Sequence, residues 1–153
     1  LPTEAEWEYI ARSGSTKDFW TGAGPYQGGT TDSDVCSSEL LILDDGNTPP
    51  LQDYAWYCYT SNSHPVGKKK PNGFGMYDIH GNVWEWTNDN AGCDFPNGET
   101  DPYCSINSND AVARGGAWSS FPYYLASSTR TIASKDRRDN GIGFRVVRSN
   151  TSE

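Results

Sequence analysis

The sequence predicts a single α+β domain, spanning residues 1–153, with little regular secondary structure and long loops. Sixteen Gly and nine Pro distribute turns along the whole chain. One amphipathic helix is expected near the start, and short β-type segments are expected in the second half. Only 35% of the residues are hydrophobic, but 13% are aromatic. We therefore expect a core built on large rings, each of which buries roughly 150–250 Å².

The helix signal lies in the stretch PTEAEWEYIARSG. Thr3 is a typical N-cap, and Glu6, three residues later, is its capping-box partner. One apolar face recurs at helical spacing and consists of Trp7, Ile10 and Ala11. Gly14 is expected to end the helix, because glycine commonly follows a helix C-terminus.

The rest of the chain is predicted mainly as loop. Glycine and proline punctuate residues 13–53, and residues 54–59 (YAWYCY) look like a short buried segment. A dense block follows at 72–89. Residues 112–118 (VARGGAW) and 142–148 (IGFRVVR) are predicted strands, since they are rich in β-branched and aromatic residues.

Charge and hydropathy exclude several function classes. The formal net charge is −8, which argues against a nucleic-acid partner because phosphate binding needs clustered cations. The one basic run, Lys68 to Lys70, is interpreted as a solvated loop. No apolar run is long enough to span a membrane. No signal peptide is visible, and the chain starts abruptly at a helix, so we expect it to be the C-terminal part of a longer protein.

Four cysteines point to disulfides rather than to a zinc site, because none of them has C-x-x-C spacing. Cys93 and Cys104 flank a Gly- and Pro-containing loop, and Cys36 with Cys58 would close a second loop. Two disulfides favour an oxidising compartment. The alternative is four buried or free thiols.

Carboxylates surround the turn in GMYDIHGNVWEW. Asp78, a turn carbonyl and Glu85 could converge on Ca²⁺, which takes carboxylate and carbonyl oxygens in loops. The simpler interpretation is a metal-free turn with a capping Asp and a core Trp. His64 and His80 lie in Pro- and Gly-adjacent loops without a catalytic-triad signature, and both are predicted to be structural.

The order of four blocks resembles the formylglycine-generating enzyme (sulfatase-modifying factor) family. These blocks are LPTEAEWEYIARSG, AWYCYTSNSHPVGKKKPNGFGMYDIHGNVWEW, ARGGAW and GFRVV, and they cover most of the chain. The resemblance implies a variant of the C-type-lectin-like fold. It also implies a Ca²⁺ site with ligands from Asp78, Gly81, Val83 and Glu85. The family's other Ca²⁺ site has no clear match in residues 15–60.

Catalytic members of that family use two cysteines, five residues apart, which bind copper and act on a cysteine of a sulfatase. The matching positions here are Ser120 and Leu125. Soft thiolates select copper(I), whereas a hydroxyl is a poor ligand and an alkyl side chain is none. We therefore expect no copper and no formylglycine-generating activity.

The segment 114–147 resembles the variable region of proteins diversified by retroelements. Those regions begin R-G-G-S-W, keep an internal Arg and end I-G-F-R-V-V. Framework positions here are Arg114, Gly115, Gly116, Trp118, Arg130, Gly143, Phe144 and Arg145. Adenine-directed mutagenesis of such regions yields a restricted residue set. The residues here that fit that set, and that we predict to bind ligand, are Ser119, Ser120, Phe121, Tyr123, Tyr124, Thr129, Thr131, Asp139, Asn140 and Gly141.

The composition of this segment suits a binding surface, because tyrosine gives large contact area at low rotamer cost and serine adds adaptable polar contacts. We expect a variable receptor for a protein or cell-surface ligand, located at a cell surface, outside cells or on a virion. Two alternatives stay open. One is an oxidase that has lost the copper-binding pair, and the other is a structural or adhesive domain whose rings at 121–124 lie in the core. Arg114, Arg130 and Arg145 are expected to bond loop carbonyls as scaffold.

Overall fold

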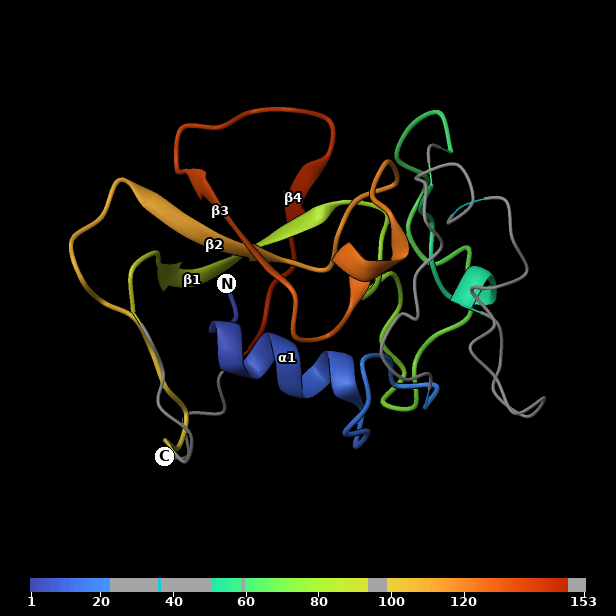
Figure 1. The fold of residues 1–153 in the computed structure, drawn as a ribbon, viewed down its shortest axis with the longest axis horizontal. Coiled ribbons are helices and arrows are strands. Elements are labelled where there is room, and N and C mark those ends of the chain that lie inside the picture. Colours follow the sequence, from blue (N-terminus) through green and yellow to red (C-terminus); the bar gives the residue numbers. More distant parts are fainter. Residues whose placement is uncertain (23–35, 37–50, 59, 94–98, 149–153) are drawn as a thin grey trace.

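The computed structural model is a small curled sheet with one helix and long loops, which confirms the α+β class (Figure 1). It describes residues 1–22, 36, 51–58, 60–93 and 99–148. The helical elements are α1 (Glu4–Arg12) and the 3₁₀ turns η2 (Leu51–Asp53) and η3 (Pro122–Leu125). The strands are β1 (Trp84–Asn90), β2 (Asp110–Arg114), β3 (Arg130–Ser134) and β4 (Ile142–Phe144).

The predicted capping box of α1 is confirmed. Thr3 Oγ1 accepts from the backbone N–H of Glu6 at 3.1 Å, and Glu6 Oε2 accepts from the N–H of Thr3 at 2.8 Å. The helix ends one residue earlier than Gly14 suggested. Ser13 is the C-cap with φ 45°, and its N–H donates to the carbonyl of Tyr9. A residue with left-handed backbone angles at this position lets its N–H satisfy a carbonyl at the end of the helix. Ser13 therefore takes the capping role that was expected of Gly14.

The four strands run in the order β3-β2-β1-β4, antiparallel except for the β1–β4 pair. The predicted strand at 112–118 stops at Arg114, because Gly115 and Gly116 turn the chain with φ values of 96° and 75°. The one at 142–148 is paired only from Ile142 to Phe144. Strands β1 and β3 were not predicted, since their pairing depends on partners far away in the chain.

The two faces of the sheet differ in what covers them. Helix α1 lies along one face, where Glu4 N donates to Asp89 Oδ2 and Trp7 Nε1 donates to Glu85 Oε2, both at 2.6 Å. Side chains alternate along a strand, so Trp84 and the other even-numbered residues of β1 point to the opposite face. We call this second side the open face. Residues 135–141 arch above it between β3 and β4 (Figure 1).

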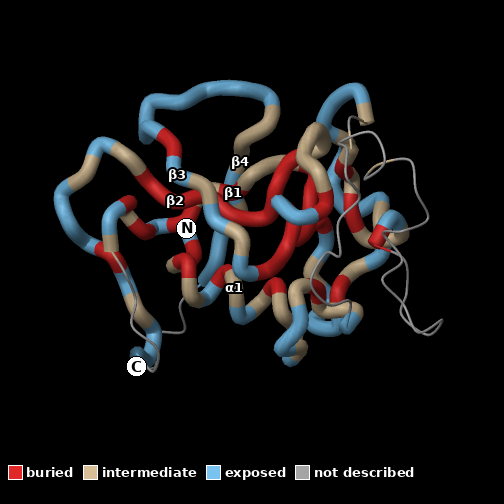
Figure 2. The backbone as a smooth tube through the Cα atoms, viewed as in Figure 1, coloured by how far each residue is buried: buried red, intermediate tan, exposed pale blue. Residues whose placement is uncertain are grey.

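Buried residues concentrate between α1 and the sheet and inside the loop region (Figure 2). One cluster contains Phe19, Leu51, Ala55, Tyr57, Leu125 and Ala126. The other contains Trp7, Ala11 and Ile79. The backbone of Gly81 packs closely against the backbone of Trp56. Gly81 has φ 80°, and an added Cβ would lie 2.1 Å from the carbonyl oxygen of Trp56. No other residue fits there.

Both suspected disulfides are present, Cys36–Cys58 and Cys93–Cys104, so the interpretation as free thiols is wrong. Within the part of the chain that the structure describes, no helix is long and apolar enough to cross a membrane.

A buried guanidinium connects α1, β2 and the loop that precedes β3. Arg114 is 1% exposed, and it donates to the carbonyls of Ser128 at 2.7 Å and Ser127 at 2.8 Å. The same side chain pairs with Glu8 and, at 3.6 Å, with Glu4. Burial raises the pKa of Glu4, whereas the nearby Arg114 lowers it. The prediction that this arginine is scaffold is therefore supported by its contacts.

We predict that Arg114→Met lowers the free energy of unfolding by about 3–5 kcal/mol, because it removes a buried charge that neutralises the buried Glu4 and leaves the carbonyl of the buried Ser127 without its donor. Urea denaturation measures this change. The control is Arg148→Met at an exposed arginine, where a change within about 0.5 kcal/mol is expected. Equal effects of the two substitutions would contradict the assignment.

Candidate functional site

The 3₁₀ turn η3 separates an inward side from an outward side. Pro122 and Leu125 are three residues apart, which places them on the same side of a 3₁₀ turn, and both are buried. Leu125 is 0% exposed and belongs to the loop core. Tyr123 and Tyr124, between them, are 37% and 42% exposed. The core interpretation therefore does not hold for these two tyrosines.

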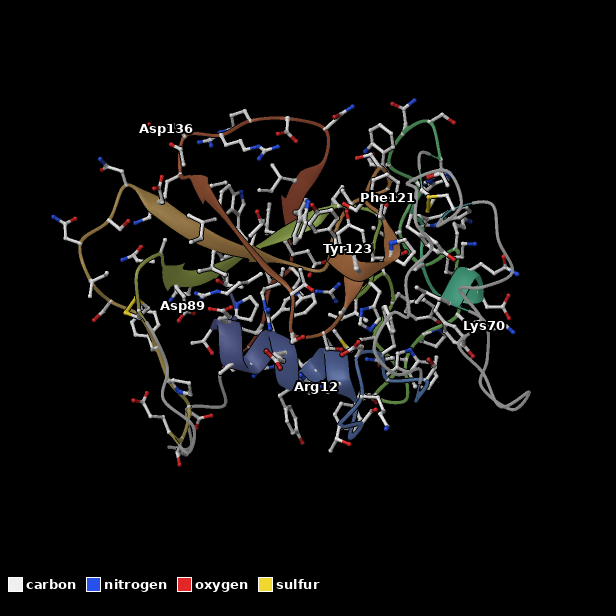
Figure 3. The ribbon with its side chains drawn as sticks, viewed as in Figure 1. Arg12, Lys70, Asp89, Phe121, Tyr123 and Asp136 are labelled. Carbon is white, nitrogen blue, oxygen red and sulfur yellow. A yellow bond between two sulfur atoms is a disulfide. The ribbon has the colours of Figure 1, made fainter. Side chains whose placement is uncertain are left out.

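The outward rings touch one another and extend toward the sheet (Figure 3). Phe121 and Tyr123 have ring centroids 5.9 Å apart, and Tyr123 and Tyr124 are 4.2 Å apart. Tyr124 meets Trp84 of β1 edge to face at 6.4 Å. We call these four residues the aromatic strip. Mutual ring contacts fix their orientation and leave part of each tyrosine accessible.

The segment before η3 is docked on the turn at residues 81–82. The N–H of Gly81 donates to the carbonyl of Gly115, and the N–H of Trp118 donates to the carbonyl of Asn82, both at 2.8 Å. Gly116 lies directly against the core, because an added Cβ would be 2.7 Å from Leu125 Cδ1. The base of the aromatic strip is thus fixed by backbone contacts rather than by the exposed side chains.

The loop before β4 reaches the same region. The carbonyl of Gly141 accepts from the N–H of Trp84 at 2.8 Å, and Asp139 Oδ1 accepts from the N–H of Gly141 at 2.8 Å. Asp139 also pairs with Arg137 at 2.5 Å, and the hydrogen bond from Arg137 lowers the pKa of Asp139. Trp84 therefore contacts both Tyr124, in the first part of the predicted ligand-binding set, and Gly141, at its end.

The other predicted ligand-binding residues are more dispersed. Thr129 Oγ1 donates to the carbonyl of Tyr123 at 2.9 Å, so this hydroxyl supports the strip from behind. Ser119 is half-buried and Asn140 is exposed. Thr131 lies on β3, two strands away from β1, and the contacts of the described residues do not connect it to the strip. Trp84 was missed as a site residue, although its alternation with Trp86 was visible in the sequence.

The two positions of the catalytic cysteine pair have structural roles. Ser120 Oγ accepts from the N–H of Ala117 at 2.9 Å, and the carbonyl of Ser120 accepts from the N–H of Cys58 at 2.9 Å. Leu125 fills the core, and its carbonyl accepts from Nδ1 of His80 at 2.7 Å. Burial lowers the pKa of His80 to about 4, so this ring is neutral at physiological pH and holds the end of η3.

Three of the four predicted calcium ligands line one pocket of about 350 Å³: Asp78, Val83 and Glu85. Asp78 is buried with φ 54°, and its Oδ2 accepts from the N–H of Gly67 at 2.7 Å. Its Oδ1 is buried and has no hydrogen-bond partner among the described residues, so one carboxylate oxygen is available to a cation. Gly81 is adjacent, although it does not line this pocket.

A guanidinium competes for the second carboxylate of that pocket. Arg145 donates to Glu85 Oε2 at 2.5 Å and to Glu85 Oε1 at 2.6 Å, and Trp7 Nε1 donates to Oε2 as well. Within the described ranges, no group of three or more His, Cys, Asp or Glu residues is placed to hold a metal ion. Any cation in this pocket therefore depends on Asp78 and on backbone carbonyls more than on Glu85.

Comparisons with known proteins agree with this fold. Residues 1–150 match the family described as "Sulfatase-modifying factor enzyme 1-like domain". A formylglycine-generating enzyme of Mycobacterium tuberculosis is 32% identical, over 96% of this chain and 50% of that protein. "Inactive C-alpha-formylglycine-generating enzyme 2" of Bos taurus is 29% identical, over 96% of this chain and 43% of that protein. The chain thus spans about half the length of the curated relatives it matches.

One solved structure bears directly on the exposed segment. "Treponema denticola variable protein 1" is 34% identical and superposes with a TM-score of 0.68, over 94% of this chain and 45% of that one. The family resemblance and the resemblance to a variable protein are both supported by these likenesses.

We predict that Tyr123→Ser and Tyr124→Ser each lower the free energy of unfolding by about 1–2 kcal/mol, less than the loss of a fully buried side chain, since both rings are already partly in water. Leu125→Ala, in the same turn, is the matched buried control and should cost about 2–5 kcal/mol. Thermal and urea unfolding measure all three variants. A loss at either tyrosine as large as that at Leu125 would show that the strip is core.

Proposed function

The chain belongs to the family of sulfatase-modifying factor enzyme 1-like domains, and we propose that it is a variable ligand-binding protein built on that scaffold. One observation carries this proposal. The turn that follows the Gly115–Gly116 pair presents two half-exposed tyrosines outward, while the catalytic cysteine positions of the family are occupied by Ser120 and Leu125. The surface is suited to contact, and the pair of thiols required for copper chemistry is missing.

The aromatic strip has the properties of a paratope. Tyrosine offers a large amphipathic surface with few rotatable bonds, and aromatic residues are enriched among the contacts that dominate binding energy. The neighbouring Ser119, Asn140 and Thr129 supply polar groups that can adapt to different partners. In this proposal the ten predicted positions set which ligand binds, and the buried framework keeps the same fold in every variant.

The proposed partner is a protein or another cell-surface ligand. The proposed location is a cell surface, the extracellular space or a virion. Two disulfides support an oxidising environment, since such bonds persist outside the reducing cytosol. The net charge of −8 makes nucleic acid a poor candidate partner.

We also propose that Ca²⁺ binds beside the docked turn, with Asp78 Oδ1 and the carbonyls of Gly81 and Val83 as ligands. The buried, unpartnered Oδ1 of Asp78 supports this proposal. Glu85 would be shared between the ion and Arg145. Because the turn holds Gly115 and Trp118, a bound ion would stabilise the base of the aromatic strip.

The first prediction of the proposed function concerns DNA. We expect a near-copy of the codons for residues 114–147 close to the gene, beside a reverse-transcriptase gene. The copy should differ from the gene at positions where the copy has an adenine. These differences should fall on codons of the ten predicted residues. Sequencing of the surrounding DNA tests this.

The competing enzyme hypothesis gives the opposite outcome. Stoichiometric copper in the purified protein, or conversion of a substrate cysteine to formylglycine in a sulfatase peptide, would overturn the proposal. Variants that differ only at the ten positions should keep the same melting temperature, and a scatter of many degrees among them would also contradict it.

The second prediction concerns the ion. Excess EDTA should lower the melting temperature, because an ion bound only by the native state adds about 2.7 kcal/mol when its concentration is 100 times its Kd. Asp78→Asn should lose this response, whereas Asp53→Asn at an exposed Lys70 pair should retain it. A melting temperature unaffected by EDTA and by added Ca²⁺ would refute the site.

A further inference from the structure

A pocket of about 710 Å³ lies on the open face, lined by residues of β1, of β4 and of the loop that joins β3 to β4. Its volume is within the range of about 300–1,000 Å³ that is usual for ligand sites. Its lining includes three rings and three cations: Trp86, Tyr103, Phe144, Lys135, Arg137 and Arg138. We call it the cationic pocket.

The rings come from elements that the fold fixes. Trp86 and Phe144 are register partners on the parallel strands β1 and β4, so their side chains lie next to each other on the open face. Phe144 is 67% exposed, which is unusual for a ring in a paired strand. Tyr103 is held by its neighbour Cys104, which is bonded to Cys93 and donates its N–H to Asp89 Oδ1. The apolar wall is therefore preformed.

The cations come from a loop with its own internal bonds. Arg138 Nη1 donates to the carbonyls of Lys135 at 2.9 Å and Arg137 at 2.8 Å. Lys135 Nζ donates to the carbonyl of Ser108 at 2.9 Å, and its N–H donates to the carbonyl of Asn109 at 3.0 Å. These contacts hold the loop over the pocket.

The positive charge of the pocket is only partly neutralised. Asp139 pairs with Arg137, but among the described residues no carboxylate pairs with Lys135 or Arg138. Asp136 follows Lys135 and is exposed, yet it does not line the pocket (Figure 3). The net charge of −8 already favours solubility, so solubility does not explain this positive charge. Two cations without carboxylate partners therefore lie beside three rings for another reason.

We infer that the cationic pocket binds an acidic peptide segment of the partner. The carboxylate of an Asp or Glu would lie between Lys135 and Arg138, and an adjacent aromatic or aliphatic side chain would pack on Trp86 and Phe144. Charge-assisted hydrogen bonds from a guanidinium favour a carboxylate, and the exposed rings favour an apolar neighbour over a purely hydrophilic polyanion. This inference rests on the proposed function, since it names the chemistry of the partner.

The pocket and the aromatic strip belong to one continuous surface. Ile142 of β4 lines the pocket and is the register partner of Trp84, which Tyr124 contacts. Two of the pocket rings, Trp86 and Phe144, occupy strands, whereas the predicted variable residues lie mostly in loops. The pocket would then provide a common affinity for acidic segments, and the variable residues would select among them.

The test uses the full chain with both disulfides and a library of acetylated, amidated hexapeptides. At low salt, peptides with Asp or Glu beside Phe, Trp or Leu should be enriched at least tenfold over their Asn or Gln counterparts. The best peptide should shift the indole ¹⁵N–¹H resonance of Trp86, identified among the six tryptophans with Trp86→Phe. Its Kd should rise at least tenfold in Lys135→Gln/Arg138→Gln and in Phe144→Ser.

Controls separate this inference from the proposed function. Lys68→Gln/Arg148→Gln removes two cations outside the pocket and should leave the Kd unchanged. Unchanged melting temperatures show that the pocket variants fold. Equal binding of acid and amide peptides, displacement by inorganic phosphate with no effect of Phe144→Ser, or the absence of any enriched peptide would overturn the inference. If any of these outcomes occurs while the retroelement template is found, the pocket assignment fails and the proposed function stands.

Discussion

The buried charge of Arg114 is the constraint on which the exposed segment depends. Arg114 ends β2, Arg130 begins β3, and the two are register partners in the sheet. Both side chains reach Glu4 on α1, so the helix neutralises the strand ends that it covers. The chain between them leaves the sheet and returns to the same place. Its path is fixed at both ends by groups that face the helix.

This arrangement separates a buried side from an exposed side within a single turn. Pro122 and Leu125 fill the inward side of η3, while the tyrosines between them face outward. His80, kept neutral by burial, holds the carbonyl of Leu125 from the opposite side. A polar substitution on the outer side removes contact area from water-exposed rings, whereas one on the inner side opens a cavity in the loop core. A scaffold with this division can accept many outer surfaces.

Local chemistry explains which features the sequence could predict. The capping box of α1 depends on residues three apart, and both disulfides followed from the placement of four cysteines. Strands β1 and β3 escaped prediction because their pairing depends on partners far away in the chain. For the same reason Trp84 was missed, and so was the cationic pocket, which combines β1 and β4 with residues 103, 135 and 137–139. Register, and not residue type, brings these groups together.

The burial of Leu125 sets the orientation of η3. Its side chain is enclosed by Phe19, Leu51 and Tyr57 in the loop core. Ser120, just before the turn, accepts from the N–H of Ala117 and fixes the chain where it enters η3. The exposed tyrosines are a consequence of that same orientation, because a turn that buries its first and last residues must present the two between them.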